Sequence, residues 1–550
     1  MKKQNIYIAS VLLLSALGLS SCNSFVTYDD PTATSDEQWW RTQADAQNAL
    51  GTVYASVPWA AWNTTTDAKS YMMTTGMTDD GVSRQDARGA YSQFALGLHN
   101  SMWNVGEHIW LVNYRDIRRA NRLLANIDRP FFNDENDRER FRVEARALRA
   151  FYHMELLMNY GGVPIVEEVI TADDNQRARN TEEEVYNWVV SELKACAESD
   201  FMPISYAVQA DEYRITKGVC WALISRLALY MKKYGDARDA ALAVIGLNKY
   251  ELHPSYATLF TYAGEINKER IFIRHNGAQH AWRNFAPASL AGQPVVFPTQ
   301  ALVDSYETRQ GKIVAELGVV GAVDSTAYYR KNPAYNRDPR FYATILAGDD
   351  PDRGANSRFP TPTSPPFRPF NMATSNPDRI GANFSTATGY WLRKYLDPQD
   401  QGGTRSLDFM IIRYAEVLLN YVEALVELDD WQNSDVVKYL NEIRNRANMR
   451  PVDWAGYAGR FTGSKEEMRQ FIRRERRIEL AFEGVRYFDI RRWGIVNTVM
   501  NGSVLGAYNP NTSAHDPVET RSYDPNRDNL WPIPSREMRA NPNMVQNPNY

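Results

Sequence analysis

Apolar residues recur at three- and four-residue steps through much of the first half of the chain. The clearest run puts on one face Val143, Ala147, Phe151, Met154 and Leu157. That spacing is typical of a helix with a single buried stripe. Gly161 and Gly162 predict the end of this helix, and Pro164 follows them.

The same periodicity predicts eight further helices, over 36–56, 105–127, 181–198, 215–232, 235–246, 408–428, 433–446 and 465–483. Thr181, followed by Glu184, predicts a capping box. The pair 214–230 and 234–245 has the small-residue and aromatic spacing of a tetratricopeptide hairpin. No strict period repeats, so such hairpins are expected to be degenerate.

Helical periodicity fades between about 247 and 405, where Pro, Gly, Asn and aromatic residues dominate. Segment 346–390 is especially Pro-rich and predicts extended loop. Helices return at 408–483, and the tail from 495 onward is predicted to be loop. The pattern therefore indicates a mainly α scaffold carrying long aromatic loops, a common setting for ligand sites.

Composition narrows the choice of partner. The chain has 550 residues, of which 44% are hydrophobic and 12% aromatic, with 14 Trp and 31 Tyr. Aromatic residues fill cores but also form platforms for sugar rings, and composition does not separate these uses. The formal charge is −4, with Lys and Arg mixed among Asp and Glu. This mixture argues against a nucleic-acid partner, which needs a concentrated basic face.

The first 22 residues predict export and a lipid anchor. Lys2 and Lys3 precede a short apolar stretch, Ile6 to Leu19, as in a secretory signal. Leu19-Ser-Ser-Cys22 resembles a lipobox, in which the cysteine receives diacylglycerol and becomes the new N-terminus. We therefore expect a signal peptide over 1–21, an anchor at Cys22 and a tether over 22–35. The alternative is an ordinary signal peptide with a chance cysteine.

The other two cysteines, Cys196 and Cys220, fall in helical patterns. No CxxC motif occurs, so neither a zinc site nor a thioredoxin-like site is predicted. Two buried thiols are expected, with a disulfide left open as the alternative.

Several longer strings, in order, carry a family resemblance. They are EARALRAFY at 144–152, YGGVPI at 160–165, IRYAEVLLNY at 412–421, RRERRIELAFEG at 473–484, FDIRRW at 488–493, WPIP at 531–534 and QNPNY at 546–550. With them the chain resembles, essentially end to end, the SusD/RagB family of outer-membrane nutrient-binding lipoproteins.

That resemblance implies a SusD-like α-helical bundle with degenerate tetratricopeptide hairpins and long irregular loops. It implies one domain over 36–550, with N-terminal helices to 246, a loop-rich ligand region over 247–405 and C-terminal helices and tail from 406. It also implies that the protein captures oligosaccharide at the cell surface and delivers it to a TonB-dependent SusC-like transporter. A peptide-binding lid, or a pure interaction scaffold of the transporter, is the alternative.

Sequence motifs give little support for a catalytic function. The chain lacks GxSxG, HExxH and a P-loop. Asp524, Asn526 and Asp528 begin like a calcium loop, but Asn529 and Ser535 stand where Gly and Glu are needed. No cofactor or metal is therefore predicted. A glycosidase needs only two carboxylates, so 66 acidic residues leave a hydrolase as a third alternative.

Sugars bind to exposed, rigid aromatic faces flanked by planar hydrogen-bonding side chains. Three loops hold such residues, 57–104, 276–298 and 354–390. The candidate ligand contacts are Trp59, Trp62, Asp79, Arg84, Trp103, Trp282 and Phe285. The resemblance suggests an acid paired with a nearby arginine, a role for Asp79 or Asp80 with Arg84. The alternative for each aromatic residue is a place in the core.

Overall fold

The structure is a computed structural model that describes residues 39–60, 69–85, 91–171, 174, 176–314, 319–320, 323–324, 336–348, 367–402 and 405–550. Cys22 and Trp62 lie outside the described residues, as does the Pro-rich stretch 349–366. Within these ranges, each helix is either too short or too polar to cross a bilayer.

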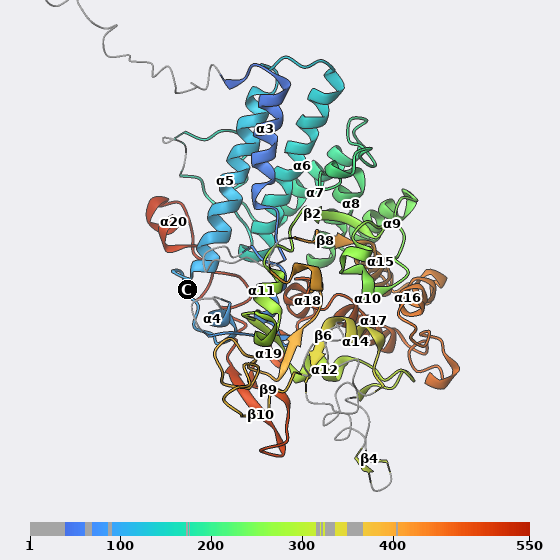
Figure 1. The fold of residues 1–550 in the computed structure, drawn as a ribbon. Coiled ribbons are helices and arrows are strands. Elements are labelled where there is room, and N and C mark those ends of the chain that lie inside the picture. Colours follow the sequence, from blue (N-terminus) through green and yellow to red (C-terminus); the bar gives the residue numbers. More distant parts are fainter. Residues whose placement is uncertain are drawn as a thin grey trace, which may run out of the picture.

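The N-terminal helices form a layered array (Figure 1). They are α3 (Gln43–Val53), α5 (Asn104–Asn126), α6 (Glu135–Tyr160), α7 (Glu182–Glu198), α8 (Lys217–Tyr230) and α9 (Tyr234–Gly246). From α5 to α9, each helix packs against the next in the chain. The predicted end of α6 is confirmed, because Gly161 follows its last residue with a φ of 75°. The predicted capping box is confirmed as well, because Thr181 and Glu184 form one at the start of α7.

Most of the C-terminal helices pack together against α8 and α9, whereas the last one lies beside α5 (Figure 1). They are α15 (Tyr414–Glu427), α16 (Ser434–Arg446), α17 (Lys465–Glu479), α18 (Arg486–Arg492), α19 (Val496–Val499) and α20 (Ser535–Ala540). Helix α15 contacts α8 and α9 as well as α16 and α17. One hydrophobic core therefore extends from Trp40 to Met544.

Two predictions of local structure were wrong. The helix expected over 408–428 begins only at Tyr414, because Phe409–Arg413 forms strand β8, antiparallel to β2 (Arg270–Arg274). A short apolar run fits a buried strand and a buried helix equally well. The tail expected to be loop contains a hairpin of β9 (Gly502–Asn509) and β10 (Ala514–Arg521). Its register shifts around Pro517 blur the alternation that predicts strands.

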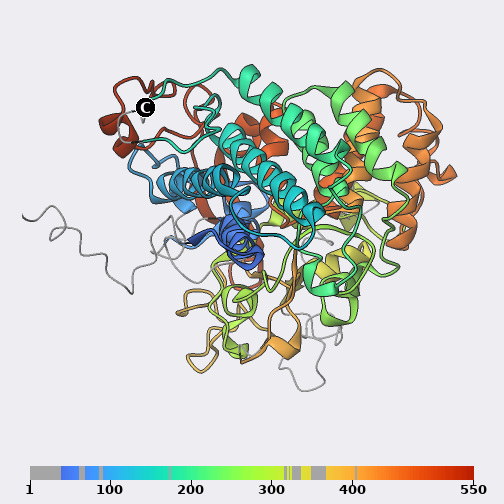
Figure 2. The same cartoon turned by 90° about the horizontal axis from the view of Figure 1, so that it is seen from above.

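The loop-rich middle of the chain contains several short strands and short helices. The strand pairs are β1 (Gly81–Ser83) with β3 (Val296–Pro298), β4 (Val319–Val320) with β5 (Val323–Asp324), and β6 (Ile345–Ala347) with β7 (Tyr390–Leu392). The short helices are α4 (Ser92–Ala95), α10 (Tyr256–Leu259), α11 (Ala281–Phe285), α12 (Gln300–Ser305) and α14 (Pro339–Thr344). Figure 2 shows the yellow-green and gold loop segments gathered on one side, opposite the cyan and green helices.

Buried ion pairs connect the middle of the chain to α17. Glu479 accepts hydrogen bonds from Arg340 and Arg413, and Glu475 accepts from Arg340 and Arg444. Burial opposes ionisation of both acids, but the guanidiniums outweigh it and lower both pKa values. These paired charges hold α17 against the middle of the chain.

Candidate functional site

The three candidate loops meet in one region of the molecule. Strand β1 of the first loop pairs with β3 of the second, and the Arg84 amide donates to the Val295 carbonyl at 2.9 Å. The second loop is tied to the third, where Ser289 donates to Asp378 from its amide at 3.0 Å and from its hydroxyl at 2.6 Å. Segments more than 80 residues apart therefore build one surface.

Arg84 and Phe384 form an aromatic–cation pair at this junction. The Arg84 guanidinium carbon lies 5.7 Å from the centroid of the Phe384 ring, and both side chains are half-buried. Phe384 has a φ of 61°, in the left-handed region that bulky side chains rarely occupy. Such backbone strain persists only where the surroundings hold it, and it concentrates at ligand sites. The pair thus presents a rigid, partly exposed ring.

Planar polar side chains lie close to this pair in the second loop. Arg283 is exposed, and its guanidinium donates to the Gln293 amide oxygen at 3.4 Å. Gln293 lies two residues before Val295, which bonds the backbone of Arg84. Guanidinium and amide groups suit the hydroxyls of a sugar, because both offer several hydrogen bonds in one plane.

Trp59 is also half-buried, at the other contact between the first and second loops. The amide of its neighbour Ala60 donates to the Gly277 carbonyl at 2.9 Å. The Arg274 guanidinium lies 4.3 Å from the Trp59 ring centroid and also donates to the Tyr54 carbonyl at 2.6 Å. The sequence contains no local signal for this contact, because Arg274 ends a strand that pairs far along the chain.

The structure does not support Trp103 as a ligand contact. Only 3% of its surface is exposed. Its ring packs edge-on against Trp531, with centroids 5.0 Å apart, and also contacts Phe94 and His99. A ring enclosed by aromatic neighbours has no free face for a sugar, so Trp103 is a core residue that positions the start of α5.

Trp282 and Phe285 require the same correction. Both lie on α11 and are 7% and 0% exposed. The Trp282 indole donates to the Leu290 carbonyl at 2.9 Å, which closes the loop on itself. Both rings belong to the hydrophobic core, so these residues support the candidate site from behind instead of contacting a ligand.

Asp79 is paired with arginines other than the one predicted. The side chain is 7% exposed, and Arg486 donates to both of its oxygens, at 2.9 and 2.8 Å. Arg477 lies 2.9 Å from Asp79 and donates to Asp80 at 2.7 Å. Burial opposes ionisation, yet these guanidiniums lower the pKa of Asp79, whereas burial raises the pKa of Asp80. Asp79 therefore anchors the loop and does not orient sugar.

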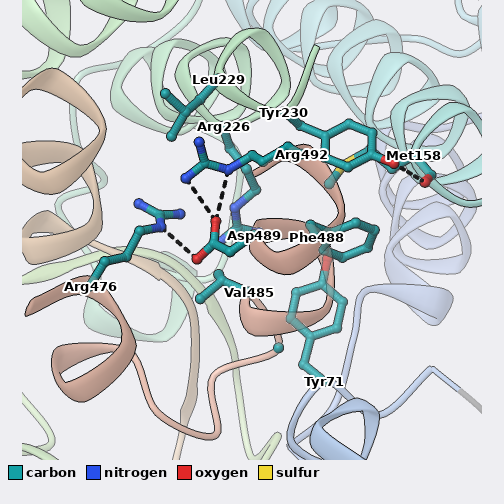
Figure 3. A pocket seen from close by; sticks show the side chains of 11 residues that line it. Tyr71, Met158, Arg226, Leu229, Tyr230, Arg476, Val485, Phe488, Asp489 and Arg492 are labelled. Atoms are coloured by element: carbon teal, nitrogen blue, oxygen red, sulfur yellow. Dashed lines mark hydrogen bonds and ion pairs between the residues drawn. The ribbon is translucent and has the colours of Figure 1, made fainter. Parts of the chain in front are cut away.

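An interior cavity near α18 is too small to be the site. Figure 3 shows Tyr71, Tyr230 and Phe488 on one side of it and Arg476, Asp489 and Arg492 on the other. Its volume is about 20 Å³, room for a single water molecule. Tyr71 enters it from the first loop and donates to Glu155 at 2.7 Å. The cavity marks where the loop is fastened to the helices.

Neither the cysteines nor the 524–528 segment forms a reactive centre. Cys196 and Cys220 are free, buried thiols, as expected, and burial raises both pKa values. Asp528 accepts a hydrogen bond from the Asp524 amide at 2.8 Å, within a turn. Across the ranges that the structure describes, no cluster of three or more His, Cys, Asp or Glu side chains could hold a metal ion.

Comparison with known proteins identifies the family to which this fold belongs. A family model described as "SusD family" matches residues 256–550, and a second, "Starch-binding associating with outer membrane", matches residues 32–229. The chain belongs to the SusD family. The resemblance in the sequence strings is confirmed, and so is the SusD-like helical fold.

The relatives of this SusD family protein span its whole length. SusD-like protein P38 of Formosa agariphila is 25% identical, with 100% of both chains covered. A SusD-like carbohydrate-binding protein of Bacteroides fragilis superposes with a TM-score of 0.79 at 26% identity, over 92% of this chain and 100% of the other. Another SusD-like protein of B. fragilis has a TM-score of 0.78 at 25% identity, over 94% and 99%.

Proposed function

We propose that this SusD family protein binds oligosaccharide at the junction of its three loops. The Arg84–Phe384 pair is the observation that carries the proposal, because it offers a rigid aromatic face beside hydrogen-bonding groups. Left-handed backbone at Phe384 holds that face in place before a ligand arrives. A structural relative described as a carbohydrate-binding protein supports the ligand class.

Binding at this junction is a matter of stacking and orientation. One face of a sugar ring would lie on Phe384, while Arg84 and Arg283 donate to its hydroxyls and Gln293 both donates and accepts. Trp59, backed by Arg274, would supply a second partly exposed ring for a longer chain. Nothing in this arrangement needs a nucleophile or an acid–base pair, so we propose capture without cleavage.

The test is binding of purified protein to a panel of polysaccharides, followed by titration of the best ligand into three variants. Phe384→Ala and Arg84→Ala should each weaken binding by about tenfold or more, since stacking and charged hydrogen bonds are each worth about 1–3 kcal/mol. Phe131→Ala is the matched control. Phe131 is 70% exposed on the connection between α5 and α6, so its loss should leave affinity unchanged.

Three outcomes would count against the proposal. Unchanged affinity in Phe384→Ala would move the site elsewhere. Peptide binding with no glycan bound would favour a peptide-binding lid. Release of shorter saccharides from the panel by the purified protein would make it a hydrolase.

We also propose that the bound glycan passes to a TonB-dependent SusC-like transporter, with the protein held at the outer membrane by lipid on Cys22. The lipobox and the family model described as associating with the outer membrane support this placement. Labelled palmitate should be incorporated into the parent but not into Cys22→Ser, which should be released from membranes. Copurification of a transporter barrel with the anchored protein tests the partner, and its absence would contradict delivery.

A further inference from the structure

A second pocket, separate from the loop junction, lies along one face of α17. Its volume is about 480 Å³, within the range of ordinary ligand sites. α12 and Ile313 line one side of it, and Trp493 and Ile495 another. Five arginines face it, namely Arg460, Arg473, Arg474, Arg477 and Arg486.

Two of these arginines are already neutralised. Arg486 holds Asp79 through two hydrogen bonds, and Arg477 holds Asp80. Arginines matched one to one with buried carboxylates have little charge left for a ligand. The positive charge that the pocket can offer to a ligand therefore depends on two neighbouring residues of α17, Arg473 and Arg474.

Arg473 lies near Glu427, a carboxylate whose hydrogen bonds come from Arg469. Glu427 accepts from Arg469 at 2.7 and 2.9 Å, whereas Arg473 comes no nearer to it than 3.8 Å. Among the described residues, the buried Nε of Arg473 has no hydrogen-bond partner. Burial lowers the pKa of Arg473, although the carboxylates of Glu423 and Glu427 oppose this shift. Arg473 is thus a desolvated cation with a donor to spare.

Arg474 repeats this arrangement on the neighbouring position. Its Nη2 forms an ion pair with Glu307 Oε1 at 3.3 Å, while Arg444 donates to Glu307 Oε2 at 2.8 Å. Within the described part of the chain, the buried Nη2 of Arg474 also makes no hydrogen bond. Adjacent residues of one helix therefore bring two incompletely satisfied guanidiniums to the same pocket.

The three acids on the pocket wall do not fill this gap. Glu466 accepts from Gln470 and Arg469, Glu467 from Ser464, and Asp304 from Gln300. Each of these acids is already held by a neighbouring side chain. An oxyanion could accept hydrogen bonds from the unused N–H groups of Arg473 and Arg474, since guanidinium binds carboxylate and sulfate through two parallel hydrogen bonds.

An aromatic surface stands next to the spare cation. The Trp493 indole is half-buried, and the guanidinium carbons of Arg492, Arg473 and Arg486 lie 4.9, 5.1 and 5.7 Å from its ring centroid. The Trp493 indole nitrogen donates to Glu423 at 2.7 Å, which fixes the ring. Guanidiniums cover this ring, so Trp493 holds Arg473 in place and does not offer a face to a sugar.

We propose that this pocket binds an acidic saccharide, with its sulfate or carboxylate on Arg473 and Arg474. The choice of a saccharide rests on the proposed glycan-binding function. The oxyanion site itself does not, because it stands on the spare guanidinium donors of α17.

The experiment uses the mature full-length protein and three probes at constant ionic strength: dextran, dextran sulfate and polygalacturonate. Titration calorimetry should detect binding of dextran sulfate, polygalacturonate or both, and not of dextran, at this site. Arg473→Gln should weaken that binding by about tenfold or more. Arg473→Lys should recover only part of it, because lysine keeps the charge but loses the planar fork.

Arg238→Gln is the matched control. Arg238 forms an exposed pair with Asp239 on α9, so this variant removes the same charge without touching the pocket. Inorganic sulfate against chloride provides a further readout in thermal melts. Sulfate stabilises folded proteins in general, so the expected signal is an extra rise in Tm in the parent and in Arg238→Gln that is missing from Arg473→Gln.

Equal binding of the three probes by the parent would overturn the proposal, as would unchanged dextran sulfate and polygalacturonate affinity in Arg473→Gln. Phe384→Ala separates the two sites. If it abolishes binding of the panel glycan and leaves the response to inorganic sulfate, the oxyanion pocket is independent of the loop junction. If the glycan proposal fails, the sulfate response of the parent still tests Arg473.

Discussion

Arg486 donates two hydrogen bonds to Asp79, at 2.9 and 2.8 Å, across 407 residues of chain. The pair fastens the first ligand loop to α18, and Arg477 of α17 joins it from the side. The candidate binding surface is thus held by the same charges that hold the C-terminal helices. The stability of the fold and the shape of the candidate surface therefore depend on the same contact.

Asp79→Asn should therefore destabilise the protein strongly. It removes one carboxylate from a buried cluster and leaves two guanidiniums to share Asp80, a loss of about 3–5 kcal/mol for a broken buried pair. Urea unfolding at neutral pH measures the change. Asp239→Asn, in an exposed pair on α9, is the control and should cost no more than about 0.5 kcal/mol. Equal losses in the two variants would contradict an anchoring role.

Backbone strain at Phe384 has its own signature. Glycine adopts a φ of 61° freely, whereas alanine does not, so Phe384→Gly should be more stable than Phe384→Ala by about 1 kcal/mol. Phe131, whose φ is not positive, should show the reverse order for the same two substitutions. Thermal or urea unfolding of the four variants gives both differences. Both Phe384 variants should lose glycan binding, because both lack the ring.

His153 should make the fold sensitive to acid. Nε2 accepts from the Val166 amide at 3.1 Å and Nδ1 lies 2.8 Å from the Arg149 carbonyl, a pattern that needs the neutral ring. Burial lowers the pKa of His153 from 6.5 to about 4. The unfolded chain therefore binds more protons between these values, and stability is lost as the pH falls from 6.5 to 4.

The shift at His153 corresponds to roughly 3 kcal/mol across that window. Urea unfolding from pH 7 to pH 4.5 should show a steep fall in the parent and a shallower one in His153→Gln. The remaining slope would come from His99, whose pKa burial also lowers to about 4, and from the paired acids of α17. Parallel curves for the parent and the variant would show that His153 does not titrate in this range.

The two buried cysteines should be inert while the protein is folded. Burial raises the pKa of the Cys196 thiol to about 12, and neither side chain is open to solvent. Ellman's reagent should give no fast reaction with folded protein that begins after Cys22, and two thiols should react in denaturant. One or two fast thiols in the folded state would contradict the burial of α7 against α8.

Local pattern was enough for most of the helices. Stripes at three- and four-residue steps, Gly161 after α6 and the capping box at Thr181 are signals within one or two turns of chain, and the structure reproduces them. Strand β8 was missed because four apolar residues in a row fit either element, and only pairing with β2 decides between them.

The candidate site was predictable only in part. Its three loops and the aromatic character of each were evident in the sequence, and Arg84 and Trp59 do lie where the loops meet. Trp103, Trp282 and Phe285 were equally good candidates by type, but burial removes their faces from solvent. Burial depends on what packs around a residue, and no local window contains that information.

The sequence by itself therefore determined the helical scaffold and the family, which depend on short-range pattern and on strings read in order. Tertiary structure alone decided which charges are satisfied. Arg486, far from Asp79 in the sequence, donates hydrogen bonds to its carboxylate. Arg473, by contrast, lies near Glu427, which already accepts hydrogen bonds from Arg469. Pairing between charges depends on distance in space, so one arginine became an anchor and the other was left with a donor for a ligand.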